Sequence, residues 1–186
     1  RHSTKLKRHI DEIKKKYHRK QRMAILQRVC PSYRLAVFRQ LCGDQDLDIK
    51  LFIGDNIPNS KVNSCDDLTG LKYHKLKTWF VRLKKRVLPW HVGLVTQLRD
   101  YSPDVILCEG ESHFIGYLQA ILYKIFNNRK VKLIHWCFIR LPGEVKTPAR
   151  RLRGLIKRFF RQFFAAFVVY SSFSKQALLK LGRSDE

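Results

Sequence analysis

Apolar runs of strand length alternate along the chain with stretches of helical periodicity. The runs predict strands at residues 23–29, 48–53, 71–76, 103–108, 131–137 and 165–170. Helices are predicted at residues 33–42, 89–99, 113–126, 150–164 and 175–181. The later strands are apolar on both faces, which is typical of a parallel sheet covered on each side. The pattern therefore predicts an α/β fold: a Rossmann-like, doubly wound parallel sheet with helices on both faces.

A basic segment precedes the first predicted strand. Its apolar positions are Leu6, Ile10, Ile13 and Tyr17. These form only a thin helical stripe, which is too narrow to bury much surface. We therefore predict a basic helical extension over residues 1–22 and one domain over residues 23–186, a length ordinary for a single domain.

The charge changes the picture. Lysine and arginine number 38 against 15 aspartate and glutamate residues, for a formal net charge of +23. Such a field attracts polyanions, which include anionic lipid surfaces, nucleic acids and phosphorylated substrates. The alternative is a merely solubilising surface, but clustering of the basic residues along the chain favours binding.

The five cysteines are odd in number, and none has CxxC spacing. This pattern is typical of reduced thiols in a cytosolic protein, and it predicts no zinc or other metal site. No run approaches the length of a membrane span, and the first 22 residues lack a signal core. The predicted location is cytoplasmic, peripheral on the cytoplasmic face of a membrane.

Residues 77–90 combine basic and aromatic side chains. They include Trp79, Phe80, Arg82, Lys84, Lys85, Arg86 and Trp90. This mixture suits an interfacial helix on anionic lipid, so these residues are predicted to bind membrane. The same composition also suits single-stranded nucleic acid, which we consider the less favoured partner. Residues 150–164 are similar in composition, but their phenylalanine stripe indicates core packing.

Ligands of doubly wound sheets bind beyond the carboxyl ends of the strands. The residues predicted to bind ligand at this edge are Tyr33, Arg34, Glu109, Glu111, His113 and Trp136. Structural alternatives remain open for several of them: Glu111 also suits a helix cap, Arg34 a solvated surface, and Trp136 simple packing.

His135 ends a predicted strand, where a histidine can act as a catalytic base. The alternative is a core histidine bonded to backbone. The chain has no Gly-x-Gly-x-x-Gly, Walker-type phosphate loop or nucleophile elbow. No common cofactor motif is therefore present.

Several motifs together resemble a known family. The most specific is residues 168–175 (VVYSSFSK), followed by Leu178 and Leu181-Gly182. Residues 103–106, the strand ending in His135 and the basic helix at 150–164 precede it in the expected order. The order is similar to that of the N-terminal domain of retaining GT-B glycosyltransferases of family four.

The resemblance implies an acceptor-binding half of an enzyme that transfers a sugar from a nucleotide-sugar donor, with His135 near the reacting sugar. It also implies a partner, the donor-binding C-terminal domain, in the same chain or as a separate subunit. This sequence departs from the family, because it lacks the first-loop glycine pair and the Glu-x7-Glu element. Two other functions remain open: a basic nucleic-acid-binding α/β protein, and a membrane-surface adaptor without chemistry.

Overall fold

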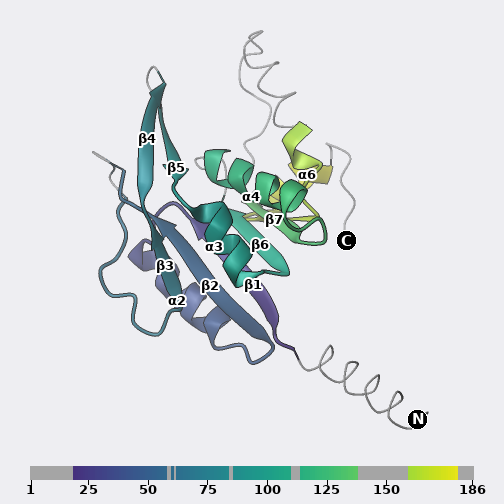
Figure 1. The fold of residues 1–186 in the computed structure, drawn as a ribbon. Coiled ribbons are helices and arrows are strands. Elements are labelled where there is room, and N and C mark those ends of the chain that lie inside the picture. Colours follow the sequence, from purple (N-terminus) through teal and green to yellow (C-terminus); the bar gives the residue numbers. More distant parts are fainter. Residues whose placement is uncertain are drawn as a thin grey trace, which may run out of the picture.

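The protein is represented by a computed structural model, which describes residues 19–57, 60, 62–83, 86–109, 114–137 and 159–179. A six-stranded sheet forms its centre, in the order β3-β2-β1-β6-β7-β8. Its strands are β1 (Gln21–Gln27), β2 (Leu47–Gly54), β3 (Tyr73–Leu76), β6 (Val105–Glu109), β7 (Lys132–Cys137) and β8 (Ala166–Val169). Every neighbouring pair is parallel. The predicted parallel sheet is confirmed (Figure 1).

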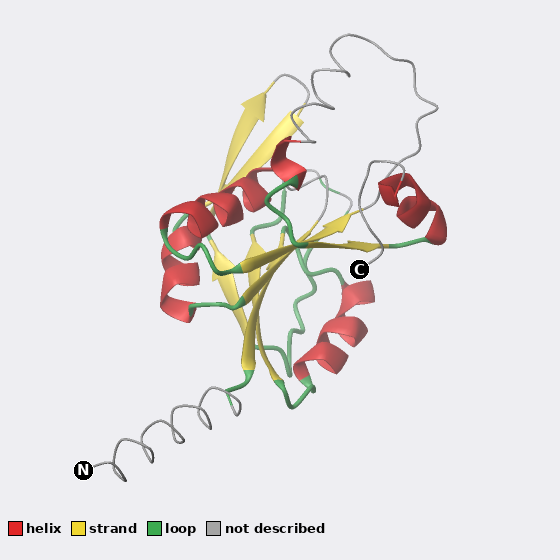
Figure 2. Cartoon of the chain, turned by 90° about the vertical axis from the view of Figure 1, so that its right-hand side faces the viewer, coloured by secondary structure: helices red, strands yellow, loops and turns green. Residues whose placement is uncertain are grey.

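Helices cover both faces of this sheet, as predicted (Figure 2). The helices are α2 (Ser32–Cys42), α3 (Leu94–Tyr101), α4 (Phe114–Phe126) and α6 (Ser172–Leu179). Helix α2 packs Phe38 with Ile25 and Leu51 of the sheet in one core cluster. Helices α3 and α4 form a second cluster that includes Ala24 and Leu26. Neighbouring residues of β1 thus enter opposite cores, because successive side chains of a strand point to opposite faces.

The segment after β3 differs from the prediction. It forms an antiparallel hairpin of β4 (Thr78–Leu83) and β5 (Arg86–His91), not an interfacial helix or a helix beginning at Pro89. The helix begins later, at Leu94 of α3, after the left-handed Gly93. Pro89 pairs with Phe80 in the hairpin. Both strands of a two-stranded hairpin are edges, where the missing N–H of proline is tolerated.

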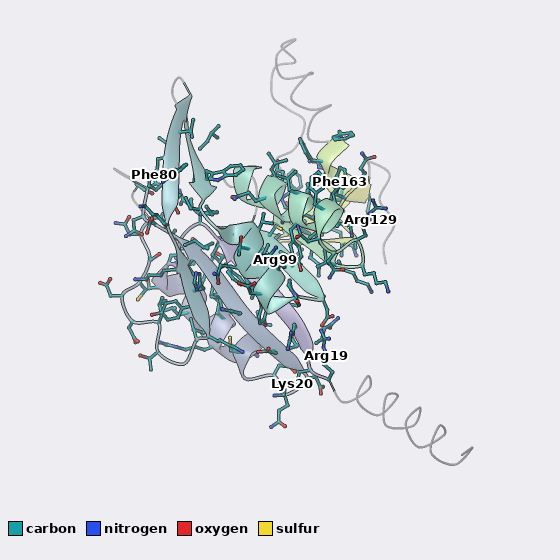
Figure 3. The ribbon with its side chains drawn as sticks, viewed as in Figure 1. Arg19, Lys20, Phe80, Arg99, Arg129 and Phe163 are labelled. Atoms are coloured by element: carbon teal, nitrogen blue, oxygen red, sulfur yellow. The ribbon has the colours of Figure 1, made fainter. Side chains whose placement is uncertain are left out.

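The hairpin stands away from the sheet at its carboxyl edge (Figure 1). Strand β3 ends at Leu76, and β4 begins two residues later. In Figure 3, Phe80 lies on the hairpin, whereas Arg19 and Lys20 lie at the opposite end of the sheet, before β1. The hairpin and the carboxyl ends of the parallel strands therefore share one side of the molecule.

Several predicted boundaries shift. Strand β1 begins at Gln21, inside the predicted extension, and α6 begins at Ser172, before the predicted start at Lys175. Of the helix predicted within the extension, over residues 3–20, residues 19–20 are described and are not helical, and the rest lies outside the described residues. Residues 150–158 of the helix predicted at 150–164 also lie outside them. No helix in the described ranges is long and apolar enough to cross a membrane.

Candidate functional site

A polar cluster lies where the strand order reverses. The chain runs from β1 outward through β2 to β3, and then returns to place β6 on the other side of β1. The carboxyl ends of β1 and β6 therefore form the topological switch point, where open α/β sheets bind ligands. Gln27 is the last residue of β1, and Glu109 is the last residue of β6.

Arg34 and Glu109 form an ion pair at this point. Their side chains are only 12% and 13% exposed. The other oxygen of Glu109 accepts a hydrogen bond from the backbone N–H of Arg28 at 3.1 Å. Arg34 also donates to Oε1 of Gln27 and, at 3.2 Å, to the hydroxyl of Tyr170. The ion pair is therefore held on several sides.

The environment keeps Arg34 charged. Burial alone lowers the pKa of its guanidinium, but the charge of Glu109 and its hydrogen bond outweigh burial, so the pKa is raised above its usual value. The guanidinium carbon lies 5.0 Å from the ring centre of Trp136 and 5.6 Å from that of Tyr33. Trp136 in turn stacks on Tyr170, with ring centres 5.6 Å apart. The rings of Tyr33, Trp136 and Tyr170 therefore lie close to the ion pair.

The structure brings together four of the predicted ligand-binding residues: Tyr33, Arg34, Glu109 and Trp136. Glu111 and His113 lie outside the described residues. Gln27 and Tyr170 were missed by the sequence analysis, although Gln27 is a polar residue that ends an apolar run.

His135 lies on the other face of β7 from Trp136, since neighbouring residues of a strand alternate. Its side chain is 8% exposed and stacks on Phe164, with ring centres 4.9 Å apart. Tyr117 and Phe167 also contact the ring. The ring is thus buried among aromatic side chains. No observation tests the predicted catalytic role, which rested on the position of His135 at a strand end and on the family resemblance.

The hairpin exposes one apolar face. Trp79 pairs with Trp90 and Val81 pairs with Leu88, and directly paired residues share a face. Trp79 is 59% exposed, Val81 49% and Trp90 37%. The other face carries Phe80 and the buried residues Thr78, Pro89 and His91. The two tryptophans predicted to contact a membrane therefore face solvent.

The remaining predicted membrane residues are only partly described. Arg82 and Arg86 occupy strand positions, but their side chains are not described. Lys84 and Lys85 lie outside the described residues. Phe80 is partly buried, so only part of its side chain is available to a membrane.

The base of the hairpin is fixed to the domain. The backbone N–H of Thr78 donates to Asp55 at 2.7 Å, and the Thr78 hydroxyl accepts from the Asp55 backbone at 3.0 Å. Gln119 of α4 bridges the backbone N–H and carbonyl of His91. A Cβ at Gly54 would lie 2.4 Å from the His91 ring, so only glycine fits there. The exposed face is therefore presented on a rigid support.

Burial is the largest influence on the pKa of His91. It lowers the pKa of the imidazole to about 4, although the charge of Asp55 acts in the opposite direction. In the part of the chain that the structure describes, no cluster of three or more metal-ligating side chains occurs. Cys30, Cys42, Cys65 and Cys108 are free thiols.

Comparisons with known proteins give no family. No family model matches the chain, and no curated protein matches it. A solved structure, phenylacrylic acid decarboxylase from Aquifex aeolicus, is similar at 12% identity and a TM-score of 0.37. The similarity covers 90% of this chain and 99% of that one. Such a low score carries no argument about the activity of this chain.

The predicted glycosyltransferase assignment is wrong: no family model matches the chain, and the similar solved structure is a decarboxylase. This correction covers the family, the acceptor-binding function, the retaining activity and the GT-B half. Ser171, which belongs to the most specific of the motifs that suggested the family, has a local structural role. It caps α6 by accepting a hydrogen bond from the backbone of Ser174 at 3.2 Å.

The nucleotide-sugar donor and the C-terminal partner domain were implied only by that resemblance, and no observation tests either of them. The comparisons also give no support to the nucleic-acid-binding or adaptor alternatives.

Proposed function

We propose that this chain binds anionic membrane surfaces peripherally through the β4–β5 hairpin. The observation that carries the proposal is the pair of solvent-facing tryptophans, Trp79 and Trp90, on a hairpin that stands away from the sheet. Tryptophan is enriched at membrane interfaces because its ring is apolar and its N–H is polar.

The charge favours an anionic surface. Four basic residues follow one another closely in the sequence where β4 ends and β5 begins: Arg82, Lys84, Lys85 and Arg86. The whole chain carries a formal net charge of +23. Each basic residue near an anionic membrane contributes roughly 1 kcal/mol of attraction. The apolar face and these basic residues together provide two signals, which stable peripheral binding usually needs.

The neighbouring aliphatic residues favour lipid over nucleic acid. Val81 and Leu88 lie on the same face as the tryptophans. Bases of a single strand stack on aromatic rings and Arg planes, so aliphatic side chains add little. Acyl chains and headgroup-level lipid contact both kinds of side chain.

Vesicle co-sedimentation tests the proposal. We expect wild-type protein to bind vesicles that contain phosphatidylserine and to bind phosphatidylcholine vesicles weakly. Trp79→Ala/Trp90→Ala should reduce the partition coefficient about tenfold or more, equivalent to about 1.4 kcal/mol. The matched control is Phe126→Ala, because Phe126 is 77% exposed at the far end of α4, away from the hairpin.

A second variant separates charge from insertion. Replacing Arg82, Lys84, Lys85 and Arg86 by serine should weaken vesicle binding and flatten its dependence on salt. Vesicle binding that survives both sets of substitutions would contradict the proposal. Tight binding of a single-stranded oligonucleotide would also contradict it, if the tryptophan variant loses oligonucleotide binding as strongly as it loses vesicle binding.

A further inference from the structure

Helix α2 begins at the switch point without a side-chain cap. Pro31 occupies the cap position, and no side chain there accepts a hydrogen bond from the first turn. The first turn also has no acidic residue. The amino end of a helix carries a partial positive charge and free N–H groups, which are suited to an anion.

Gln27 supplies an independent sign of a ligand at the same place. The residue is 1% exposed, and its Oε1 accepts from Arg34, which lies in the first turn of α2. Among the described residues, the Nε2 of Gln27 has no hydrogen-bond partner. The bond from Arg34 fixes which end of the amide is oxygen, so Nε2 is the end left without an acceptor. A buried donor without an acceptor destabilises the fold, so an acceptor is expected.

The carboxylate at this point is already neutralised. Arg34 pairs with one oxygen of Glu109, and the backbone N–H of Arg28 donates to the other. The ion pair therefore leaves no net negative charge that would repel an anion.

We propose that an oxyanion, a phosphate or carboxylate group of a ligand, binds between the amino end of α2 and Gln27. The Nε2 of Gln27 donates to the anion, the α2 dipole stabilises its charge, and the paired rings of Trp136 and Tyr170 flank it. This site is separate from the exposed face of the hairpin, although both lie at the carboxyl edge of the sheet.

Thermal unfolding with inorganic phosphate as the probe tests the site. We expect about 10 mM phosphate to raise the Tm of the wild-type chain by about 2–4 °C over chloride of equal ionic strength. Gln27→Glu should lose this rise, because it keeps the acceptor for Arg34 and replaces the donor by a repelling oxygen. Gln40→Glu, an exposed change of equal charge on α2, should keep it.

Phosphate also stabilises proteins non-specifically, but that effect acts equally on both variants. Equal Tm rises in Gln27→Glu and Gln40→Glu would overturn the proposal, and so would no rise in the wild type. If Gln27→Glu fails to fold, Gln27→Met, which has no amide donor, replaces it in the same comparison.

Two arms then identify the source of the anion. A loss of vesicle binding by Gln27→Glu, with the hairpin intact, identifies a lipid headgroup. Unchanged vesicle binding with lost phosphate binding identifies a soluble ligand. The hairpin proposal is tested separately: it fails if the tryptophan variant binds vesicles as well as the wild type does.

Discussion

Replacing Glu109 by glutamine should lower the free energy of unfolding by about 3–5 kcal/mol, because it leaves the Arg34 guanidinium buried without its counter-ion. The side chain of Arg34 is only 12% exposed, so water can replace little of the lost interaction. Glutamine keeps the volume of Glu109, so the loss reports charge and hydrogen bonding and not a cavity. Urea unfolding at neutral pH measures the change.

Two further variants isolate the buried charge. The double variant Glu109→Gln/Arg34→Met should be more stable than Glu109→Gln alone, because the unpaired charge is gone. Asp67→Asn removes one partner of the exposed pair between Arg39 and Asp67, which are 44% and 66% exposed, and should cost far less, because solvent screens that pair. A cost at Glu109 as small as that at Asp67 would show that solvent reaches the cluster.

The central sheet could be predicted from the sequence because its strands are buried on both faces. Such strands are continuous apolar runs, as in residues 105–108, and glycine or polar loops separate them. The helix at Ser32–Cys42 was predicted within one residue, since Leu35 and Phe38 give it a clear buried side. Local pattern and tertiary packing agree at these places.

The hairpin could not be predicted because its pattern is ambiguous. Trp79, Phe80 and Val81 are consecutive apolar residues, so no alternation indicated a strand. Pro89 resembled the first residue of a helix. The deciding contacts are long-range, from Asp55 to Thr78 and from Gln119 to His91. Such contacts join residues far apart in the sequence, so the local pattern cannot predict them.

The site was predicted in part for a similar reason. The rule that ligands bind at carboxyl ends selected Arg34, Glu109 and Trp136, which do lie together. The same rule selected His135, but β7 directs neighbouring residues to opposite faces, so the His135 ring packs on Phe164 on the face opposite Trp136. Gln27 is recognisable only in three dimensions, where its buried Nε2 lacks an acceptor among the described residues.

The stability of the fold should fall as the pH drops from about 6.5 to about 4, with His91 as a main cause. His91 is 3% exposed, and burial lowers its pKa from 6.5 to about 4. Between these values the unfolded chain binds a proton that the folded chain does not, so acid favours unfolding. The contribution of His91 is complete above pH 6.5 and is lost progressively below it, at roughly 1.4 kcal/mol for each pH unit.

His91→Asn isolates this contribution, because asparagine can occupy the place of Nδ1 beside the Thr78 hydroxyl, which lies 3.1 Å from that atom. Urea unfolding at about pH 7 and about pH 5 should show that the wild type loses about 2 kcal/mol more than the variant. The carboxylates and other histidines titrate in both proteins, so their effects cancel in the difference. Equal losses in the two proteins would mean that His91 is protonated in the folded state, and that the hairpin base is open to water.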